Sequence, residues 1–327
     1  MKPAVDAFGR VHRSLRISVT DRCNLRCRYC MPAEGVDCMP RDELLTFDEI
    51  ALAVDVAAEM GIDRVRITGG EPLLRRGLVQ LVEMLADNSK VADVAMTTNA
   101  LLLSRHAEAL ADAGLNRVNI SLDSLDPRRF HEITRYGLLE TAWKGVEAAT
   151  AAGFSPLRIN VLLLDGFNDD EIQGWLDLTA RCEVDVRFME LMPIGEGVRM
   201  NRQGRYVDVA RFRDRLVAEK GLVTADVEVG NGPARYWSVP GAPGRIGFIT
   251  PVSEPYCNLC SRMRLTSIGR LRPCLAFDEE VDLRPALREG DREVVREGFL
   301  RALADKPAGH HWSGGQITKS TMSSVGG

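Results

Sequence analysis

Residues 23–30 read CNLRCRYC and place Cys23, Cys27 and Cys30 at the spacing C-x3-C-x2-C. They directly follow an alternating apolar run over residues 15–19, which predicts a β-strand. Thiolates are the usual protein ligands of iron–sulfur clusters, and a cubane cluster normally takes four of them. Three clustered thiolates therefore leave one iron open for another ligand. A structural zinc ion more naturally takes four ligands, so the stretch favours a cluster over a partial zinc site or unrelated thiols.

The composition is that of a globular protein with a proper core. The chain has 327 residues, of which 45% are apolar and 27% charged, and its net charge of −4 argues against a general nucleic-acid binder. We expect no membrane span and no signal peptide, because no apolar run is long enough. The clustered cysteines favour a reducing cytoplasm. Cys38 and Cys182 stand alone and are expected to be packing or surface thiols.

Short β-rich runs alternate with longer helical runs up to about Glu190. The predicted strands are Leu15–Val19, Arg64–Thr68, Asp93–Thr97, Arg117–Leu122, Leu157–Leu164 and Val184–Met189. The predicted helices between them are Phe47–Met60, Gly77–Asp87, Ser104–Ala113, Thr141–Ala152 and Asp169–Cys182. Such alternation predicts an α/β fold with a parallel sheet. Six units favour a partial (β/α)6 TIM-type barrel, although an open doubly wound sheet has the same periodicity.

Each predicted strand has one apolar and one polar face, because successive side chains point to opposite sides. If the apolar faces pack on the helices, the interior carries Arg16, Arg66, Thr68, Thr97, Asn119, Ser121, Arg158, Asn160 and Arg187. Buried arginines are costly without anionic partners. The pattern therefore predicts a polar cavity for a charged ligand; the alternative is that some strands are edges with solvated faces.

After Glu190 the pattern becomes irregular, with one predicted helix over Val209–Glu219. We interpret residues 1–230 as the barrel domain, and residues 231–327 as a C-terminal region with a second cysteine set and a Gly-Gly end. The irregular extension is expected to close the open side of the barrel. Composition alone predicts a flexible tail from Lys306 onward.

Two further motifs carry chemistry. Gly69-Gly70-Glu71-Pro72 follows the second predicted strand, at the end where barrel enzymes place active sites. Cys257, Cys260 and Cys274 form a second set of three thiolates, which by themselves fit zinc and an iron–sulfur cluster equally. Arg262 and Arg264 follow closely, and guanidinium groups suit phosphate.

The first cysteine loop and the Gly-Gly-Glu-Pro segment together resemble the radical S-adenosylmethionine (SAM) superfamily, in which SAM chelates the open iron. The resemblance implies SAM contacts at Tyr29, Gly69, Gly70, Glu71, Ser121, Asn160 and Met192.

The two cysteine sets, residues 261–264 and the terminal Gly-Gly resemble the GTP 3′,8-cyclase (MoaA) family of molybdenum-cofactor biosynthesis over nearly the whole chain. This resemblance implies two [4Fe–4S] clusters, the second of which binds guanine through its open iron. It implies GTP contacts at Arg16, Arg66, Thr97, Arg158, Arg187, Arg262, Met263 and Arg264, and an activating role for Gly326 and Gly327. The family commonly has Lys where this chain has Arg158, which makes that contact the one most in doubt.

The implied reaction begins with one-electron reduction of the first cluster and cleavage of SAM. The 5′-deoxyadenosyl radical then takes hydrogen from C3′ of GTP, and the substrate radical attacks guanine C8. The implied partners are an external one-electron donor and the downstream cyclic pyranopterin monophosphate synthase, and a homodimer is compatible with the family. Two rival hypotheses are a peptide-modifying radical SAM enzyme with an auxiliary cluster and a non-catalytic iron–sulfur redox protein.

Overall fold

The structure is a computed structural model that describes residues 3–225, 232–323 and 325–326. Its centre is a mixed sheet with the order β12-β11-β10-β1-β2-β3-β4-β5-β6-β9-β8-β7, whose two ends do not pair within the described residues. The strands are β1 (Ser14–Ser18), β2 (Arg64–Thr68), β3 (Asp93–Thr98), β4 (Arg117–Ser121), β5 (Leu157–Leu162), β6 (Val184–Met189), β7 (Val223–Thr224), β8 (Arg235–Ser238), β9 (Arg245–Ile249), β10 (Arg262–Leu265), β11 (Arg270–Arg272) and β12 (Val281–Asp282).

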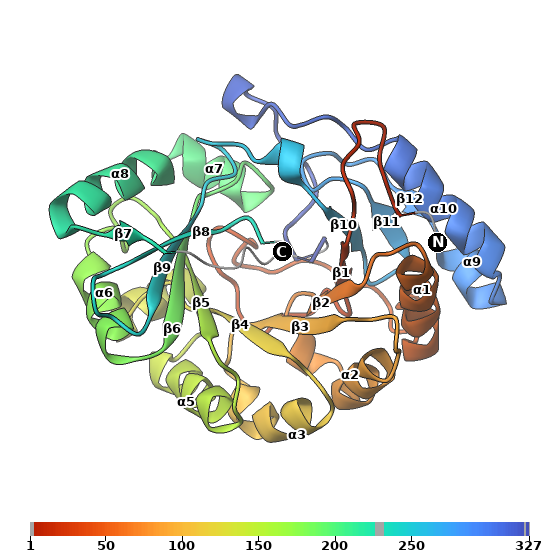
Figure 1. Cartoon of the computed structure of the whole chain (residues 1–327), viewed down its shortest axis with the longest axis horizontal. Coiled ribbons are helices and arrows are strands. Elements are labelled where there is room, and N and C mark those ends of the chain that lie inside the picture. The colour runs from red at the N-terminus through yellow and green to blue at the C-terminus, as the bar shows by residue number, and fades with distance from the viewer. Residues whose placement is uncertain (1–2, 226–231, 324, 327) are drawn as a thin grey trace.

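Helices surround this sheet in Figure 1. They are α1 (Phe47–Glu59), α2 (Leu78–Ala86), α3 (Ala107–Asp112), α4 (Pro127–Thr134), α5 (Leu139–Ala151), α6 (Ile172–Arg181), α7 (Glu196–Arg202), α8 (Val209–Lys220), α9 (Arg284–Glu289) and α10 (Arg292–Ala304). Short 3₁₀ turns occur at Pro72–Leu74, Leu103–Arg105, Cys257–Leu259 and Trp312–Gly314. No helix in the described part of the chain is long and apolar enough to cross a membrane.

β1 to β6 are parallel neighbours in chain order, as a partial TIM-type barrel requires. This sequential order excludes the doubly wound alternative, in which the strand order reverses at a switch point. Local chemistry sets the helix ends. Thr46 and Glu49 form a capping box at the start of α1, and Gly61 follows that helix with a φ of 85° that favours glycine.

The two faces of the barrel strands divide as the alternation predicts. Leu15, Ile17, Val65 and Ile67 are buried in the core between sheet and helices. The polar residues of the same strands face inward. The inside of the barrel is therefore a polar space, and the interpretation of these strands as solvated edges is wrong.

The C-terminal extension is more regular than the sequence predicts. β9 adds to the β6 edge in parallel, and β10 adds to the β1 edge in parallel. α9 and α10 lie beside α1 (Figure 1). The extension therefore continues the barrel wall from both sides. The expected domain boundary at residue 230 lies outside the described residues.

The expectation of a flexible tail is also wrong for the described residues. Thr318 pairs with Ile194 in an isolated bridge, and Ser323 and Val325 are buried. The C-terminal segment runs back to the middle of the barrel (Figure 1).

Candidate active site

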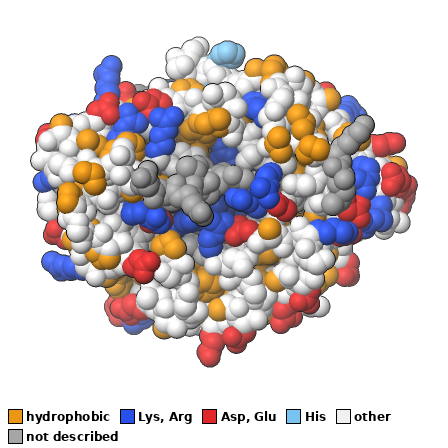
Figure 2. Space-filling model, viewed as in Figure 1, with side chains coloured by type: hydrophobic (Ala, Val, Ile, Leu, Met, Phe, Trp, Pro, Cys, Tyr) orange, Lys and Arg blue, Asp and Glu red, His pale blue; other side chains and the backbone are white. Residues whose placement is uncertain are grey.

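A single cavity of about 530 Å³ fills the inside of the barrel and is lined by both cysteine sets and by the inward side chains of the strands. Lys and Arg side chains gather near the middle of the face shown in Figure 2. The cavity brings together parts of the chain as distant as Cys23 and Cys274.

The first cysteine set lies on a loop that is fixed by its neighbours. The backbone N–H groups of Arg26 and Arg28 donate to carbonyls at the end of α4. Burial raises the pKa of Cys23 to about 11 and that of Cys30 to about 12, so the free thiols are neutral. A bound metal reverses this preference because it holds a coordinating thiol deprotonated.

Gly69 and Gly70 are required by close packing against the chain that leads into the cysteine loop. A Cβ on Gly69 would lie 2.5 Å from the Thr20 carbonyl oxygen, and one on Gly70 would lie 2.3 Å from the Arg22 carbonyl oxygen. Only glycine fits both positions, so these residues let the end of β2 approach the cysteine loop.

Glu71 is buried, and its carboxylate is occupied by protein donors. It accepts from the Thr98 hydroxyl at 2.7 Å and from the Asn99 and Leu73 N–H groups at 2.8 and 3.1 Å. Burial raises its pKa to about 7. In this arrangement Glu71 connects the ends of β2 and β3.

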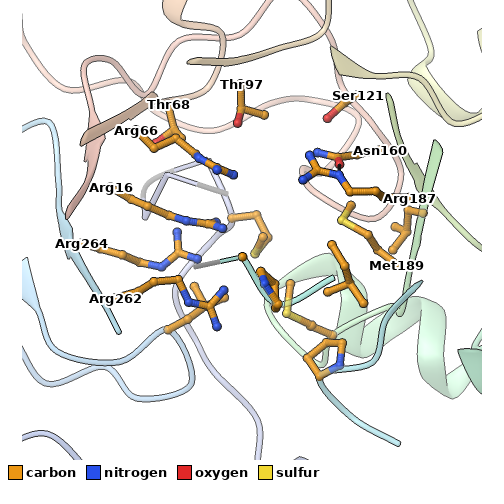
Figure 3. A pocket seen from close by; sticks show the side chains of 18 of the residues that line it. Arg16, Arg66, Thr68, Thr97, Ser121, Asn160, Arg187, Met189, Arg262 and Arg264 are labelled. Atoms are coloured by element: carbon orange, nitrogen blue, oxygen red, sulfur yellow. Dashed lines mark hydrogen bonds between the residues drawn. The ribbon is translucent and has the colours of Figure 1, made fainter. Parts of the chain in front are cut away.

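The remaining residues expected to contact SAM line the same cavity. Tyr29 donates its hydroxyl hydrogen to Asp123 at 2.7 Å. Ser121 and Asn160 project into the cavity (Figure 3), and Met192 lines it as well. Arg187 donates to the Asn160 side-chain oxygen at 2.9 Å.

The second cysteine set is built from three pieces of chain: the turn at Cys257, the start of β10 near Cys260, and the loop after β11 at Cys274. Within the described residues, no three His, Cys, Asp or Glu side chains are placed to hold a single metal ion. Each set offers three thiolates, one fewer than a structural zinc ion takes and the number that leaves one iron of a cubane cluster open.

Several arginines converge on the cavity from opposite walls (Figure 3). None of them has a carboxylate within salt-bridge distance among the described residues; they are Arg16, Arg66, Arg187, Arg262 and Arg264. Burial lowers the pKa of Arg16 to about 10, and the nearby Arg262 adds to the effect. Unneutralised cations facing one cavity require an anionic ligand.

Three other residues expected to contact GTP differ from these arginines in their charge, their partners or their orientation. Thr97 projects into the cavity (Figure 3). Arg158 lines it too, but its Nε lies 3.7 Å from the buried Asp185 carboxylate. The Met263 side chain is buried in the hydrophobic core on the opposite face of β10, so only its backbone is available to a ligand.

The chain end lies against the same arginines. Arg264 donates to the Val325 carbonyl at 3.2 Å and to the Gly326 carbonyl. A Cβ on Gly326 would lie 2.4 Å from the Thr68 hydroxyl oxygen. Gly327 lies outside the described residues.

Sequence reasoning missed two polar residues in the site, Asn99 and Asp123. Asn99 donates to Asn24 of the cysteine loop at 2.8 Å, and Asp123 accepts from Tyr29. Asn99 directly follows β3, and Asp123 lies two residues after the last residue of β4. Their position at the C-terminal ends of β3 and β4 is the signal that could have identified them.

Two family models match the chain. The model described as "Radical SAM superfamily" matches residues 17–179, and the one described as "Molybdenum Cofactor Synthesis C" matches residues 184–312. A protein named GTP 3′,8-cyclase from Heliobacterium modesticaldum is 46% identical over 99% of this chain and 100% of its own length. The chain belongs to the GTP 3′,8-cyclase family. A second family member, from Pelotomaculum thermopropionicum, is 46% identical over 98% of this chain and 99% of its own length.

Solved structures support the barrel fold of this cyclase family member. SuiB from Streptococcus suis, bound to S-adenosylmethionine, superposes with a TM-score of 0.58 at 17% identity, covering 86% of this chain and 65% of that one. The protein described as native anSMEcpe with bound AdoMet gives a TM-score of 0.53 at 13% identity, covering 91% and 82%. At these identities the likeness concerns the fold alone.

Proposed function

We propose that this chain is a radical SAM lyase that converts GTP to (8S)-3′,8-cyclo-7,8-dihydroguanosine 5′-triphosphate, the first step of molybdenum-cofactor biosynthesis. The observation that carries the proposal is the shared cavity, where both cysteine sets face arginines that have no carboxylate partner among the residues that the structure describes. The cysteines suit the clusters that radical SAM chemistry needs, and the arginines suit the negative charge of a triphosphate substrate. When bound, the first [4Fe–4S] cluster and SAM supply a 5′-deoxyadenosyl radical that takes hydrogen from the ribose C3′.

The residues have separate roles in this proposal. Cys23, Cys27 and Cys30 hold the cluster that binds SAM, and Cys257, Cys260 and Cys274 hold the cluster that binds guanine. SAM lies against Tyr29, Gly69, Gly70, Ser121, Asn160 and Met192, with Glu71 acting through its hydrogen bonds to the end of β3.

The triphosphate lies among the inward arginines. They neutralise its charge and fix the ribose near the SAM site, which is the main demand on a protein that guides a radical. This group comprises Arg16, Arg66, Arg158, Arg187, Arg262 and Arg264, with Thr97 and the Met263 backbone as neutral contacts. Gly326 and Gly327 orient the arginines in this proposal, which is supported by the hydrogen bond that Arg264 donates to the Gly326 carbonyl.

The finer assignments also belong to the proposal. We divide the chain functionally at residues 230 and 231, because each part carries one cysteine set. An external one-electron donor reduces the protein, and cyclic pyranopterin monophosphate synthase consumes the product. A homodimer is compatible with the family. Eight cysteines without a disulfide among the described residues support a cytoplasmic location.

The test is anaerobic reconstitution with iron and sulfide, followed by assays with SAM and a chemical reductant. With GTP we expect 5′-deoxyadenosine and the cyclised nucleotide in equal amounts; without GTP we expect slow, uncoupled SAM cleavage. Turnover of a peptide but not of GTP would favour the peptide-modifying alternative. Cluster reduction without any SAM cleavage would favour the non-catalytic redox protein.

A further inference from the structure

Lys306 is a buried cation behind the second cysteine set. The residue is 3% exposed and lines the cavity beside Cys257, Cys260 and Cys274. No carboxylate lies within salt-bridge distance of its ammonium group among the described residues. A buried ammonium without a carboxylate is costly, so its position needs a reason.

The ammonium group connects two separate pieces of the second cysteine set. Its Nζ donates to the Arg262 carbonyl at 2.8 Å and also to the Pro273 carbonyl. Arg262 lies two residues after Cys260, and Pro273 directly precedes Cys274. One side chain thus fixes the spacing between the pieces of chain that carry these two thiols.

Arg10, in the N-terminal segment, connects the third piece of chain in the second cysteine set to the segment that carries Lys306. Its guanidinium donates to the Cys257 and Ala308 carbonyls, both at 2.8 Å, and to the Pro307 carbonyl at 2.7 Å. Its Nε is paired with Asp6 at 2.6 Å. The third thiol is therefore tied to the segment that carries Lys306.

The two cysteine sets differ in the carboxylates around them. Glu71 at Cys23 and Asp123 at Cys27 and Cys30 lie near the first set, where Arg26 also donates to the Cys23 carbonyl at 2.7 Å. Buried cations lie near the second set: Lys306 lines the cavity beside these cysteines, and its ammonium group donates to the Arg262 and Pro273 carbonyls.

We propose that Lys306 is a positioning residue that holds the chain segments of the second cluster in place and makes that cluster easier to reduce. The proposal rests on the proposed second cluster. One-electron reduction adds a negative charge to a cluster, and a nearby fixed cation stabilises the reduced form. Cluster potentials respond to net charge and to hydrogen bonds around the sulfurs.

The experiment uses the full chain with Cys23→Ser, Cys27→Ser and Cys30→Ser, which leaves only the second cluster. Into this parent we introduce Lys306→Met, which keeps an unbranched side chain one atom shorter and removes the charge. Lys306→Arg keeps the charge, and Lys144→Met is an exposed control. The readouts are iron content, the midpoint potential from an EPR-monitored titration, and the melting temperature of the iron-free chains.

We expect Lys306→Met to shift the midpoint potential to more negative values and to lower the iron content by half or more. The midpoint potential and iron content of Lys306→Arg should be closer to those of the parent, and Lys144→Met should have the same values as the parent. Complete loss of the cluster in Lys306→Met, with an iron-free melt equal to that of the parent, would support the positioning role. An unchanged midpoint potential and iron content in Lys306→Met would overturn the proposal. A lower melting temperature of the iron-free Lys306→Met chain, together with loss of the cluster, would also overturn it, because Lys306 would then stabilise the fold as a whole. A parent without iron would instead contradict the proposed second cluster.

Discussion

Arg16 and Arg66 carry charges that no carboxylate in the described part of the chain neutralises. Both lie inside the barrel, and burial together with neighbouring arginines lowers their pKa values, that of Arg16 to about 10. Mutual repulsion raises the free energy of the ligand-free cavity, and a bound polyanion relieves it. At these positions binding and stability therefore respond to substitution in opposite directions.

We expect Arg66→Met to weaken GTP binding about ten- to a hundredfold, since a hydrogen bond to a charged group contributes about 1.5–3 kcal/mol. The melting temperature of the ligand-free protein should hold or rise, because one repelling charge is gone. Calorimetry and a thermal melt measure the two effects. Arg128→Met, at a side chain that is 94% exposed, is the control and should change neither. A lower melt with unchanged GTP affinity would contradict the assigned role.

Among the elements, the C-terminal segment has a strict steric requirement. Gly326 has a φ of 68°, and a Cβ there would lie 2.4 Å from the Thr68 hydroxyl oxygen. Any side chain must therefore displace the segment from Arg264.

Gly326→Ala should leave the melt and the iron content unchanged, while cyclisation falls at least tenfold and SAM cleavage becomes uncoupled from product. Removal of Gly326 and Gly327 together should act in the same direction, and a peptide copying the last residues should partly restore turnover. Product and 5′-deoxyadenosine are quantified by chromatography. Ser313→Ala, in an exposed turn of the same segment, is the control. Normal coupling in Gly326→Ala would show that the segment only fills space.

The N-terminal segment contains a pH-sensitive group, His12. This side chain is fully buried and its Nε2 lies 2.9 Å from Asp6. Burial lowers the pKa of His12 to about 4 despite that carboxylate, and Lys306 adds to the decrease. The folded protein therefore favours the neutral ring, whose contribution to stability is full above pH 6.5 and is lost as the pH falls toward 4.

We expect the iron-free protein to lose more melting temperature between pH 7 and about 4.5 than His12→Gln does, because glutamine cannot take up the proton. Exposed carboxylates affect both chains equally, so the difference between the curves isolates this group. His311→Gln, at an exposed ring, should follow the unsubstituted chain. Parallel curves for His12→Gln and the unsubstituted chain would contradict the assignment.

For the whole molecule, one cavity with two separate cysteine sets predicts that loss of either set impairs a different step of the reaction. Cys27→Ser should abolish 5′-deoxyadenosine formation, because the radical source is lost. Cys274→Ser should retain slow SAM cleavage but make no cyclised nucleotide, because the substrate is no longer held. Cys38→Ser, at an exposed thiol outside the cavity, is the control. Full cyclisation by a Cys274→Ser protein that lacks its second cluster would refute the division of labour.

The sequence predicts β1 to β6 to within two residues, because each alternates apolar residues for the core with polar residues for the cavity. The same alternation predicts the inward arginines, and spacing alone identifies the cysteine sets. β9 and β10 were not predicted, since they are short and their partners, β6 and β1, are distant in sequence. The contact of Lys306 with the Arg262 carbonyl depends on the position of β10, and no local pattern encodes it. The position of Asp123 after β4 is visible in the sequence, but its contact with Tyr29 joins residues far apart in the chain.

The pairing of β1 with β10 has a consequence for biosynthesis. Ser14 lies opposite Arg262, so β1, the first strand to be synthesised, can pair with β10 only after most of the chain has been translated. At about 5–20 residues per second the delay is roughly 10 to 50 s. Throughout that interval one edge of the nascent sheet is unpaired, and such edges recruit other chains. Co-translational chaperones are therefore expected to influence the yield of this protein more than that of a barrel whose neighbouring strands all follow one another in sequence.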